Sequence, residues 1–281
     1  MGVVNVPGGG LTKGADRSAA RAKLDGLSIP GTSGSTQLSY LRGDLRVGYD
    51  HHDRRIMMAA PTGGAVCTSP STGVTGPQGM GKLIDQTLIY LSQGAMSLDL
   101  APLLGFKLNG VDVRHVFDVK GRGDGRPAFE RGEANIDCQT PPAYIENTQP
   151  LVDAGTAIAL FSWGALDEDG NPVRDAIFPD LPHFGEACQM MTGKAPVGPD
   201  YDVCFAFFTA RFPAQKMVYL PKGTPADIVE AYQAAVTAMK VDPEYQALKL
   251  AVLSTYEQVT GTAAKALFDK GTVILREPRM M

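Results

Sequence analysis

Apolar positions along the 281-residue chain fall into short runs that alternate with stretches of helical periodicity. The short runs predict strands at 3–6, 27–30, 56–59, 65–68, 87–91, 113–117, 134–138, 157–161, 203–209 and 216–220. The periodic stretches predict helices at about 11–23, 36–42, 96–108, 124–132, 141–153, 182–192, 224–240, 243–253 and 261–270. Such alternation favours an α/β fold in which helices flank parallel or mixed sheets.

Composition and charge exclude several classes of protein. The formal net charge is −4, with 44% apolar residues, and no basic face of the kind that nucleic acid requires is evident. No apolar run approaches 18 residues, so we expect no membrane-inserted helix. The segment that follows Met1 has neither a basic region nor a long apolar stretch, so we expect it not to be a signal peptide.

The cysteines and an incomplete phosphate-binding motif predict no metal site and no cofactor. Cys67, Cys138, Cys188 and Cys204 form no C-x-x-C pair, which argues against a zinc site, although one disulfide stays possible. Residues 76–82 match a phosphate-binding loop up to its lysine, but a leucine follows where Ser or Thr must hold magnesium.

Residues 31–35 almost match the nucleophile elbow of hydrolases, except that the fifth position is Ser35 rather than glycine. A serine hydrolase that uses Ser33 and His183 is therefore an alternative function, supported only by the order of these residues along the chain.

Three predicted strands end in loops of small, hydroxyl- or amide-bearing residues, each of which opens a predicted helix. Free backbone N–H groups at a helix N-terminus attract an anion, and nearby hydroxyls add further donors. The loops therefore predict a site for a small carboxylate, with no charged side chain required. The candidate ligand-binding residues are Ser33, Gly34, Ser35, Thr36, Gln37, Ser92, Gln93, Ala95, Met96, Ser97, Gln139 and Thr140.

The start of the helix after the second loop has two interpretations. If Ser97 caps it, Pro102 falls in the second turn and removes a backbone hydrogen bond. If Asp99 caps it, Pro102 fits the first turn, but a carboxylate then lies beside the proposed anion site and weakens it.

Six segments, in this order, resemble a known family over nearly the whole chain. They read V-N-V-P-G-G-G at 4–10, D-G-L at 25–27 with the loop at 31–37, H-V-F-D-V-K-G at 115–121, G-E-A-N-I-D at 132–137, F-P-D-L-P at 178–182 and L-P-K-G-T-P at 220–225. The chain thus resembles the substrate-binding receptors of tripartite tricarboxylate transporters, the Bug-type receptors.

The resemblance implies a two-lobed, type II periplasmic binding protein fold with mixed sheets flanked by helices and a hinge between the lobes. Lobe 1 would comprise residues 1–82 and 212–281, and lobe 2 residues 83–211. Such a receptor is not an enzyme. It would be periplasmic, would close on a di- or tricarboxylate or a related organic acid in a cleft between its lobes, and would deliver it to membrane permease subunits.

The sequence also departs from the family pattern. The family begins with a further strand, a P-G-G loop and a helix before the segment that resembles residues 4–10, so we expect a chain shortened at its N-terminus. A degenerate relative that binds no ligand and serves a sensory partner is therefore a third interpretation.

Overall fold

The structure is a computed structural model that describes residues 2–95, 97, 99–117, 119, 122–167, 169, 171–212, 214–253 and 255–273. The chain divides into two compact units. Unit 1 comprises Met1–Thr62, Met96–Leu98 and Thr209–Met281, and unit 2 comprises Gly63–Ala95 and Asp99–Phe208. The lobe boundaries expected from the resemblance, at 82/83 and 211/212, stay a prediction.

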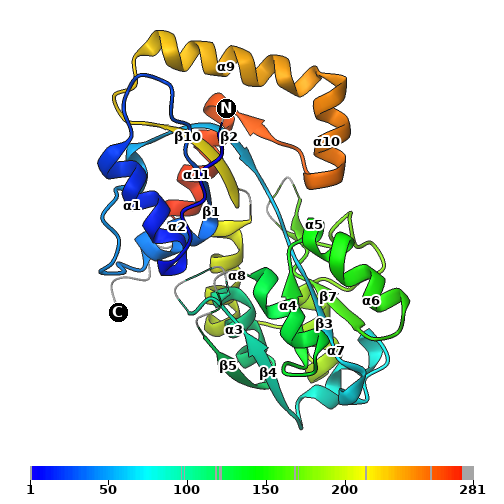
Figure 1. Cartoon of the computed structure of the whole chain (residues 1–281). Helices are drawn as coiled ribbons and strands as arrows, with labels where there is room; N and C mark the ends of the chain where they lie inside the picture. The colour runs from blue at the N-terminus through cyan, green and yellow to red at the C-terminus, as the bar shows by residue number, and fades with distance from the viewer. Residues whose placement is uncertain are drawn as a thin grey trace. The chain divides into compact units, whose positions relative to one another are not determined.

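Unit 1 is built on a four-stranded antiparallel sheet in the order β1-β10-β2-β11. Its strands are β1 (Gly31–Ser33), β10 (Lys216–Pro221), β2 (Arg54–Ala60) and β11 (Val259–Thr260). Met217 in β10 lies opposite Thr32 on one side and Ala59 on the other. The sheet thus joins strands from the chain's first quarter to strands from its C-terminal part (Figure 1).

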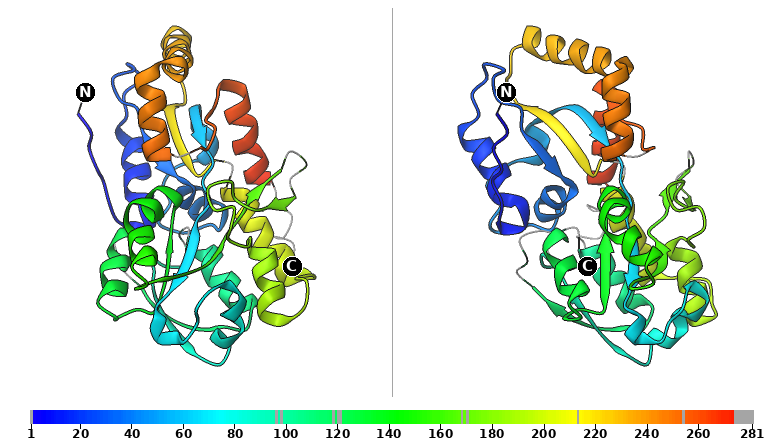
Figure 2. Two further views of the ribbon diagram at one scale, coloured as in Figure 1. Left: turned by 90° about the vertical axis from the view of Figure 1, so that its right-hand side faces the viewer. Right: turned by 45° about the vertical axis from the view of Figure 1, so that its right-hand side comes forward.

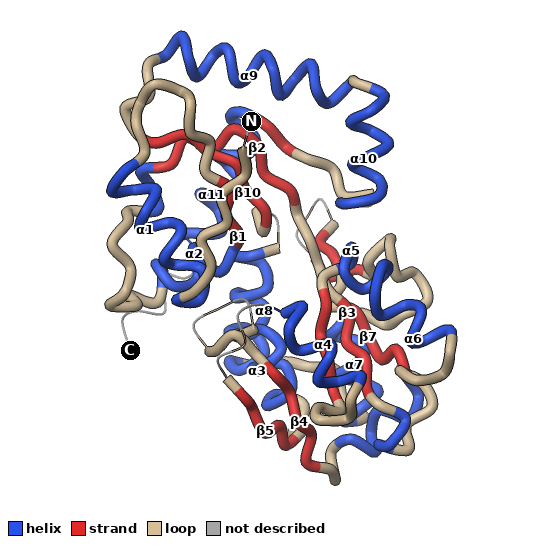
Figure 3. The backbone as a smooth tube through the Cα atoms, in the orientation of Figure 1, coloured by secondary structure: helices blue, strands red, loops and turns tan. Residues whose placement is uncertain are grey.

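Five α-helices of unit 1 surround this sheet, as Figures 2 and 3 show. They are α1 (Thr12–Arg21), α2 (Gly34–Leu41), α9 (Ala226–Val241), α10 (Pro243–Leu253) and α11 (Gly261–Val273). Two short 3₁₀ turns, η1 (Gly9–Leu11) and η2 (His51–Asp53), precede α1 and β2.

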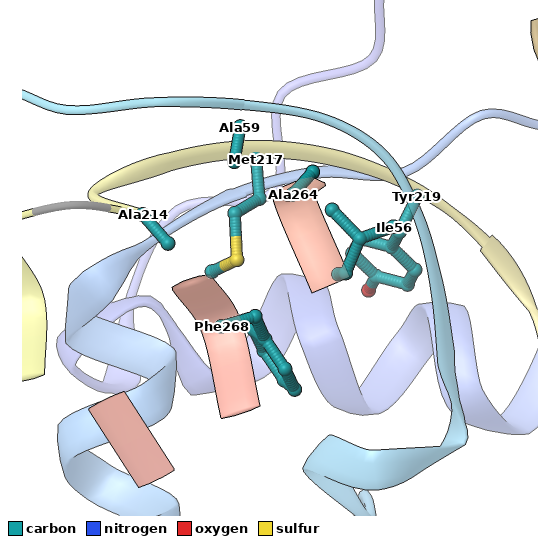
Figure 4. Close-up of a cluster of buried hydrophobic side chains, with 7 residues drawn as sticks. All are labelled: Ile56, Ala59, Ala214, Met217, Tyr219, Ala264 and Phe268. Atoms are coloured by element: carbon teal, nitrogen blue, oxygen red, sulfur yellow. The ribbon is translucent and has the colours of Figure 1, made fainter. Parts of the chain in front are cut away.

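The core of unit 1 forms between the sheet and α11. Its buried cluster consists of Ile56, Ala59, Ala214, Met217, Tyr219, Ala264 and Phe268. Figure 4 shows the side chains of Met217 and Phe268 on neighbouring elements within this cluster. Ala264 and Phe268 are four residues apart, so they lie on one face of α11 and direct that face at the sheet.

Unit 2 contains three small sheets. An antiparallel sheet in the order β6-β3-β7 joins Ile136–Gln139, Ala65–Thr68 and Ile158–Ser162. A parallel pair joins β4 (Thr87–Leu91) to β5 (Asp112–Val116), and an antiparallel pair joins β8 (Ala165–Leu166) to β9 (Pro172–Val173). Parallel and antiparallel pairs thus coexist in one α/β unit.

The helical elements of unit 2 complete its layers. They are η3 (Pro70–Thr72), η4 (Pro77–Leu83), α3 (Leu100–Leu108), α4 (Arg122–Glu130), α5 (Pro141–Ala143), the π-helical turn η5 (Tyr144–Thr148), α6 (Gln149–Asp153), α7 (Phe184–Thr192) and α8 (Pro199–Arg211). A buried cluster of Ala65, Cys67, Phe129, Ala134, Tyr144, Ala157 and Phe178 joins β3 to α4, η5 and the loop before α7. All four cysteines are buried in this unit, and none of them forms a disulfide.

These elements confirm the predicted α/β class, and several strands lie close to the predicted ranges, but three strand predictions are wrong. Residues 203–209 belong to α8, where Cys204 and Phe208 are buried one helical turn apart. The unbroken apolar run has no strand period, and Asp200 and Asp202 in the first turn are typical of a helix start. Residues 3–6 and 27–30 are not in strands, and Val3 and Leu27 are exposed to solvent.

His51 is an unusual member of the core of unit 1. Its ring is fully buried and stacks on Phe268 at a centroid distance of 4.3 Å and on Tyr40 at 5.7 Å. Neither ring nitrogen has a hydrogen-bond partner among the described residues. Burial, together with the charges of Arg54 and His52, lowers the pKa of His51 well below its ordinary value, so the ring is neutral in the folded protein.

This neutral histidine predicts a loss of stability in mild acid. Unfolding restores the ordinary pKa, so the unfolded chain takes up a proton below about pH 6.5 while the folded protein does not. The contribution of the neutral His51 ring to the free energy of unfolding is therefore fully present above that pH and is lost as the pH falls. Between pH 7 and pH 5 we expect His51 to account for a loss of up to about 2 kcal/mol, measured by urea unfolding of the wild type and of His51→Phe.

The variant His52→Phe is the control, because His52 is the adjacent residue in the same turn but is exposed. This variant should show the same difference in free energy of unfolding between pH 7 and pH 5 as the wild type. An unchanged difference in His51→Phe would refute the assignment of this pH dependence to His51.

Candidate functional site

The first predicted loop forms the start of α2 in unit 1. Ser33 is the N-cap residue, and its Oγ accepts a hydrogen bond from the backbone N–H of Ser35 at 3.4 Å. The N–H of Gly34 donates to the carbonyl oxygen of Gln215 at 2.8 Å. Two of the amide groups that an anion would use are therefore already bonded within unit 1.

The hydroxyl group of Thr36 holds this loop together. It donates to the carbonyl oxygen of Ser33 at 2.9 Å and accepts from Nη1 of Arg54 at 3.1 Å. Oγ1 of Thr32 lies 2.9 Å away and must be the donor, because the Thr36 proton is already used. A hydroxyl has one donor and two acceptor positions, and all three are used here. The predicted contact between Thr36 and a ligand would therefore involve the backbone N–H of Thr36.

The second loop follows β4 in unit 2, and its amides are also engaged. Ser92 donates its N–H to Val116 at 2.9 Å and accepts from the N–H of Gly94 at 3.2 Å. The N–H of Gln93 donates to Oδ2 of Asp99 at 2.6 Å, and Tyr90 donates its hydroxyl proton to Oδ1 at 3.1 Å. The N–H of Gln93, a predicted ligand-binding residue, is thus already bonded to the fully buried carboxylate of Asp99.

The structure also decides how the helix after this loop begins. Helix α3 starts at Leu100, so Asp99 precedes it and Pro102 lies in its first turn. Asp99 makes no side-chain capping bond to α3, because its oxygens point back to Gln93 and Tyr90. Ser97 is buried, Ala95 is exposed, and Met96 lies outside the described residues.

The third loop follows β6. The amide nitrogen of Gln139 donates to both carboxylate oxygens of Asp137, at 3.1 and 2.9 Å, and both side chains are buried. Thr140 precedes the three-residue helix α5, is half-buried, and makes no capping bond with its side chain.

Unit 2 brings the second and third loops together. The N–H of Ile89 in β4 donates to the side chain of Asn135 at 2.7 Å, so β4 runs beside the start of β6. Farther along, a Cβ atom on Gly125 would meet the carbonyl oxygen of Leu91 at 3.4 Å and Oδ1 of Asp137 at 4.0 Å. The ends of β4 and β6 therefore lie close together, and strand ends of this kind are where α/β folds bind ligands.

The geometry of His183 argues against a hydrolase. Its Nδ1 accepts from the N–H of Gly185 at 3.0 Å, and Oε2 of Glu186 accepts from the N–H of His183 at 2.8 Å, which completes a capping box for α7. A neutral ring that accepts at Nδ1 carries its proton on Nε2, so Nε2 cannot take a proton from a nucleophile. Burial lowers the pKa of His183, which keeps the ring neutral near pH 7.

The described part of the chain offers neither a metal site nor a helix that could span a membrane. No group of three or more His, Cys, Asp or Glu residues is placed to hold a metal ion there. None of the helices within the described ranges combines the length and apolar character that a membrane span needs.

Comparisons with known proteins identify the fold. No protein-family model and no curated protein matches the sequence. Among solved structures, the periplasmic binding protein BugD is 16% identical, with a TM-score of 0.68 over 96% of this chain and 84% of its own. MatC from Rhodopseudomonas palustris with bound malate is 16% identical, with a TM-score of 0.65 over 96% of this chain and 85% of its own.

A further R. palustris protein, with adipate, is 19% identical, with a TM-score of 0.63 over 93% of this chain and 82% of its own. This chain has the fold of the two-lobed periplasmic binding proteins. The predicted fold is therefore confirmed, and the resemblance to Bug-type receptors extends to their fold, because BugD is among the structural neighbours.

Sequence analysis missed the buried polar residues that organise the loops of this periplasmic binding fold. Arg54 lies between Asp53 and Arg55, and such a run of charged residues is typical of a solvated surface. In the structure its side chain is buried against Thr36. Asp137 also gave no signal, since an aspartate within a short strand has no periodicity that marks it as buried.

Because Asp99 accepts two hydrogen bonds in the second loop, its replacement should destabilise the protein. Asp99→Ala leaves the N–H of Gln93 and the hydroxyl of Tyr90 without their acceptor, so we expect the free energy of unfolding to fall by about 2–4 kcal/mol. Tyr90→Phe removes only one of the two bonds and should cost about 1 kcal/mol. Urea unfolding followed by circular dichroism measures both values.

The variant Asp85→Ala is the matched control, because it removes the same charge from an exposed turn of unit 2. Its free energy of unfolding should change by less than about 0.5 kcal/mol. A similarly small change for Asp99→Ala would show that the buried carboxylate does not support the loop.

Proposed function

We propose that this protein is an extracytoplasmic solute receptor that binds a small organic carboxylate, such as a di- or tricarboxylate. One observation carries the proposal: structural neighbours that share the fold over more than nine-tenths of this chain contain bound malate in one case and adipate in another. The proposed location is the periplasm, and the proposed recipient of the ligand is a tripartite tricarboxylate-type membrane permease.

The proposed contacts come from the residues at the ends of the strands. In unit 1 these are the first-turn residues of α2, where the helix dipole places about half a positive charge. In unit 2 they are the residues that follow β4 and β6, where the ends of these strands lie close together. Binding through backbone N–H groups and hydroxyls requires no covalent chemistry and no cofactor, so the proposal describes a receptor rather than an enzyme.

A ligand that binds only the folded protein stabilises it by an amount that depends on concentration. At a hundred times the dissociation constant the gain is about 2.7 kcal/mol, which raises the melting temperature of a protein of this size by several degrees. We expect malate, adipate or citrate to produce such a rise in a thermal-shift assay, and lactose, a neutral sugar, to produce none.

The pair Ser33→Ala and Ser69→Ala separates ligand binding from helix capping. Each serine caps a helical turn by accepting from the N–H two residues later, at 3.4 Å for Ser33 and 3.3 Å for Ser69. Both substitutions should lower the melting temperature of the free protein slightly, but only Ser33→Ala should reduce the ligand-induced rise.

Two other outcomes would favour the alternative functions. Hydrolysis of simple esters by the wild type that is lost in Ser33→Ala would indicate a hydrolase and contradict the proposal. A flat thermal response to every carboxylate would indicate a degenerate relative that binds no solute.

A further inference from the structure

Three buried residues, one in α2 and two that bond to its first turn, have side chains with unused hydrogen-bonding groups. Gln37 lies within the turn and is 1% exposed, and neither Nε2 nor Oε1 has a partner. Gln215, 2% exposed, accepts from the N–H of Gly34 through its carbonyl oxygen, but its Oε1 has no partner. Arg54, 7% exposed, reaches Thr36 with Nη1, but its Nη2 has no partner.

Such a concentration of unpaired groups is unusual. Buried polar side chains are almost always hydrogen-bonded, and leaving one unpaired costs about 1–3 kcal/mol. Elsewhere in the loops described above the protein supplies its own partners, as Asp99 does for Gln93 and Asp137 does for Gln139. The unpaired groups near α2 are therefore candidates for bonds to a partner from outside the chain.

The position of Arg54 shows which charge that partner should carry. Its guanidinium lies over the ring of Tyr49 at 4.7 Å and over that of Tyr219 at 4.8 Å. No described carboxylate forms an ion pair with it, although buried arginines are normally paired. Tyrosine faces attract a cation but leave the positive charge in place, so the remaining partner should be an anion.

The surroundings hold the guanidinium in a fixed position. The hydroxyl of Tyr49 donates to the carbonyl oxygen of Thr36 at 2.6 Å, which ties one of the two rings to α2. Tyr219 belongs to the buried cluster between the sheet and α11, which ties the other ring to the core. A group held this rigidly loses little conformational freedom when it binds, which favours affinity and selectivity.

We propose that Arg54 pairs with a second carboxylate of the ligand, and that Gln37 and Gln215 supply further hydrogen bonds to it. This inference rests on the proposed function and makes it more specific, since the ligand would be a dicarboxylate rather than a monocarboxylate. Guanidinium and carboxylate form short, charge-assisted hydrogen bonds that neutral amides do not match. Arg54 is thus the specificity-determining residue of unit 1.

Matched acids test this inference by isothermal titration calorimetry. Succinate and butyrate have the same chain length and differ in one carboxylate, and so do adipate and hexanoate. In the wild type, the diacid of at least one pair should bind about 10- to 100-fold more tightly than its monoacid, the range expected for a charged hydrogen bond. In Arg54→Met this preference should disappear through weaker binding of the diacid, while the affinity for the monoacid stays unchanged.

Arg55→Met is the matched control. Arg55 is the next residue of β2, is exposed, and projects from the opposite face of the strand, so its loss changes the net charge equally. It should keep the wild-type preference. Arg54→Lys, which retains the charge but not the planar fork, should show an intermediate preference, and it replaces Arg54→Met if circular dichroism shows that the latter does not fold.

Two unfavourable results would have different meanings. If the wild type binds diacids and Arg54→Met retains the full preference for them, this inference is refuted while the proposed receptor function stands. If the wild type binds none of the four acids and malate and citrate give no thermal shift, the inference and the choice of a small carboxylate as ligand are both refuted.

Discussion

A polar group that leaves water must find a hydrogen-bond partner within the protein, and this requirement shapes the loops at the strand ends. In unit 2 the carboxylates of Asp99 and Asp137 accept from Gln93 and Gln139, so both loops are bonded without any ligand. In unit 1 the start of α2 is only partly bonded, because Arg54, Gln37 and Gln215 keep unused groups. The same physical constraint therefore makes one set of loops rigid and leaves the other set able to accept a partner.

This difference changes the view of how such a protein binds an anion. Exposed amides at helix starts are sufficient in principle, but here several of them are already bonded to the protein itself. A buried guanidinium beside the helix start would then supply the positive charge that those amides no longer offer. Because the net charge is −4, the protein as a whole does not attract anions, so the attraction must come from local groups, of which this guanidinium would be one.

Sequence patterns located elements well where their periodicity was clear. The strands at Ala65–Thr68 and Thr87–Leu91 have the predicted bounds, and so does the helix α10 at Pro243–Leu253. The failure at 203–209 has a physical cause, because an unbroken apolar run fits a buried helix and a buried strand equally well. Its assignment to α8 depends on the burial of Cys204 and Phe208, which a sequence does not display.

The sequence by itself determined the α/β class, the resemblance to Bug-type receptors and the three loops at which polar residues follow strands, because these depend on local order along the chain. Only the tertiary structure decided which groups in those loops are already bonded. Arg54 acquires its importance from Thr36 and Tyr219, which lie beside it in space but belong to other elements of the chain. Such neighbours follow from packing, since a local pattern specifies which face of an element is apolar but not what will lie against it.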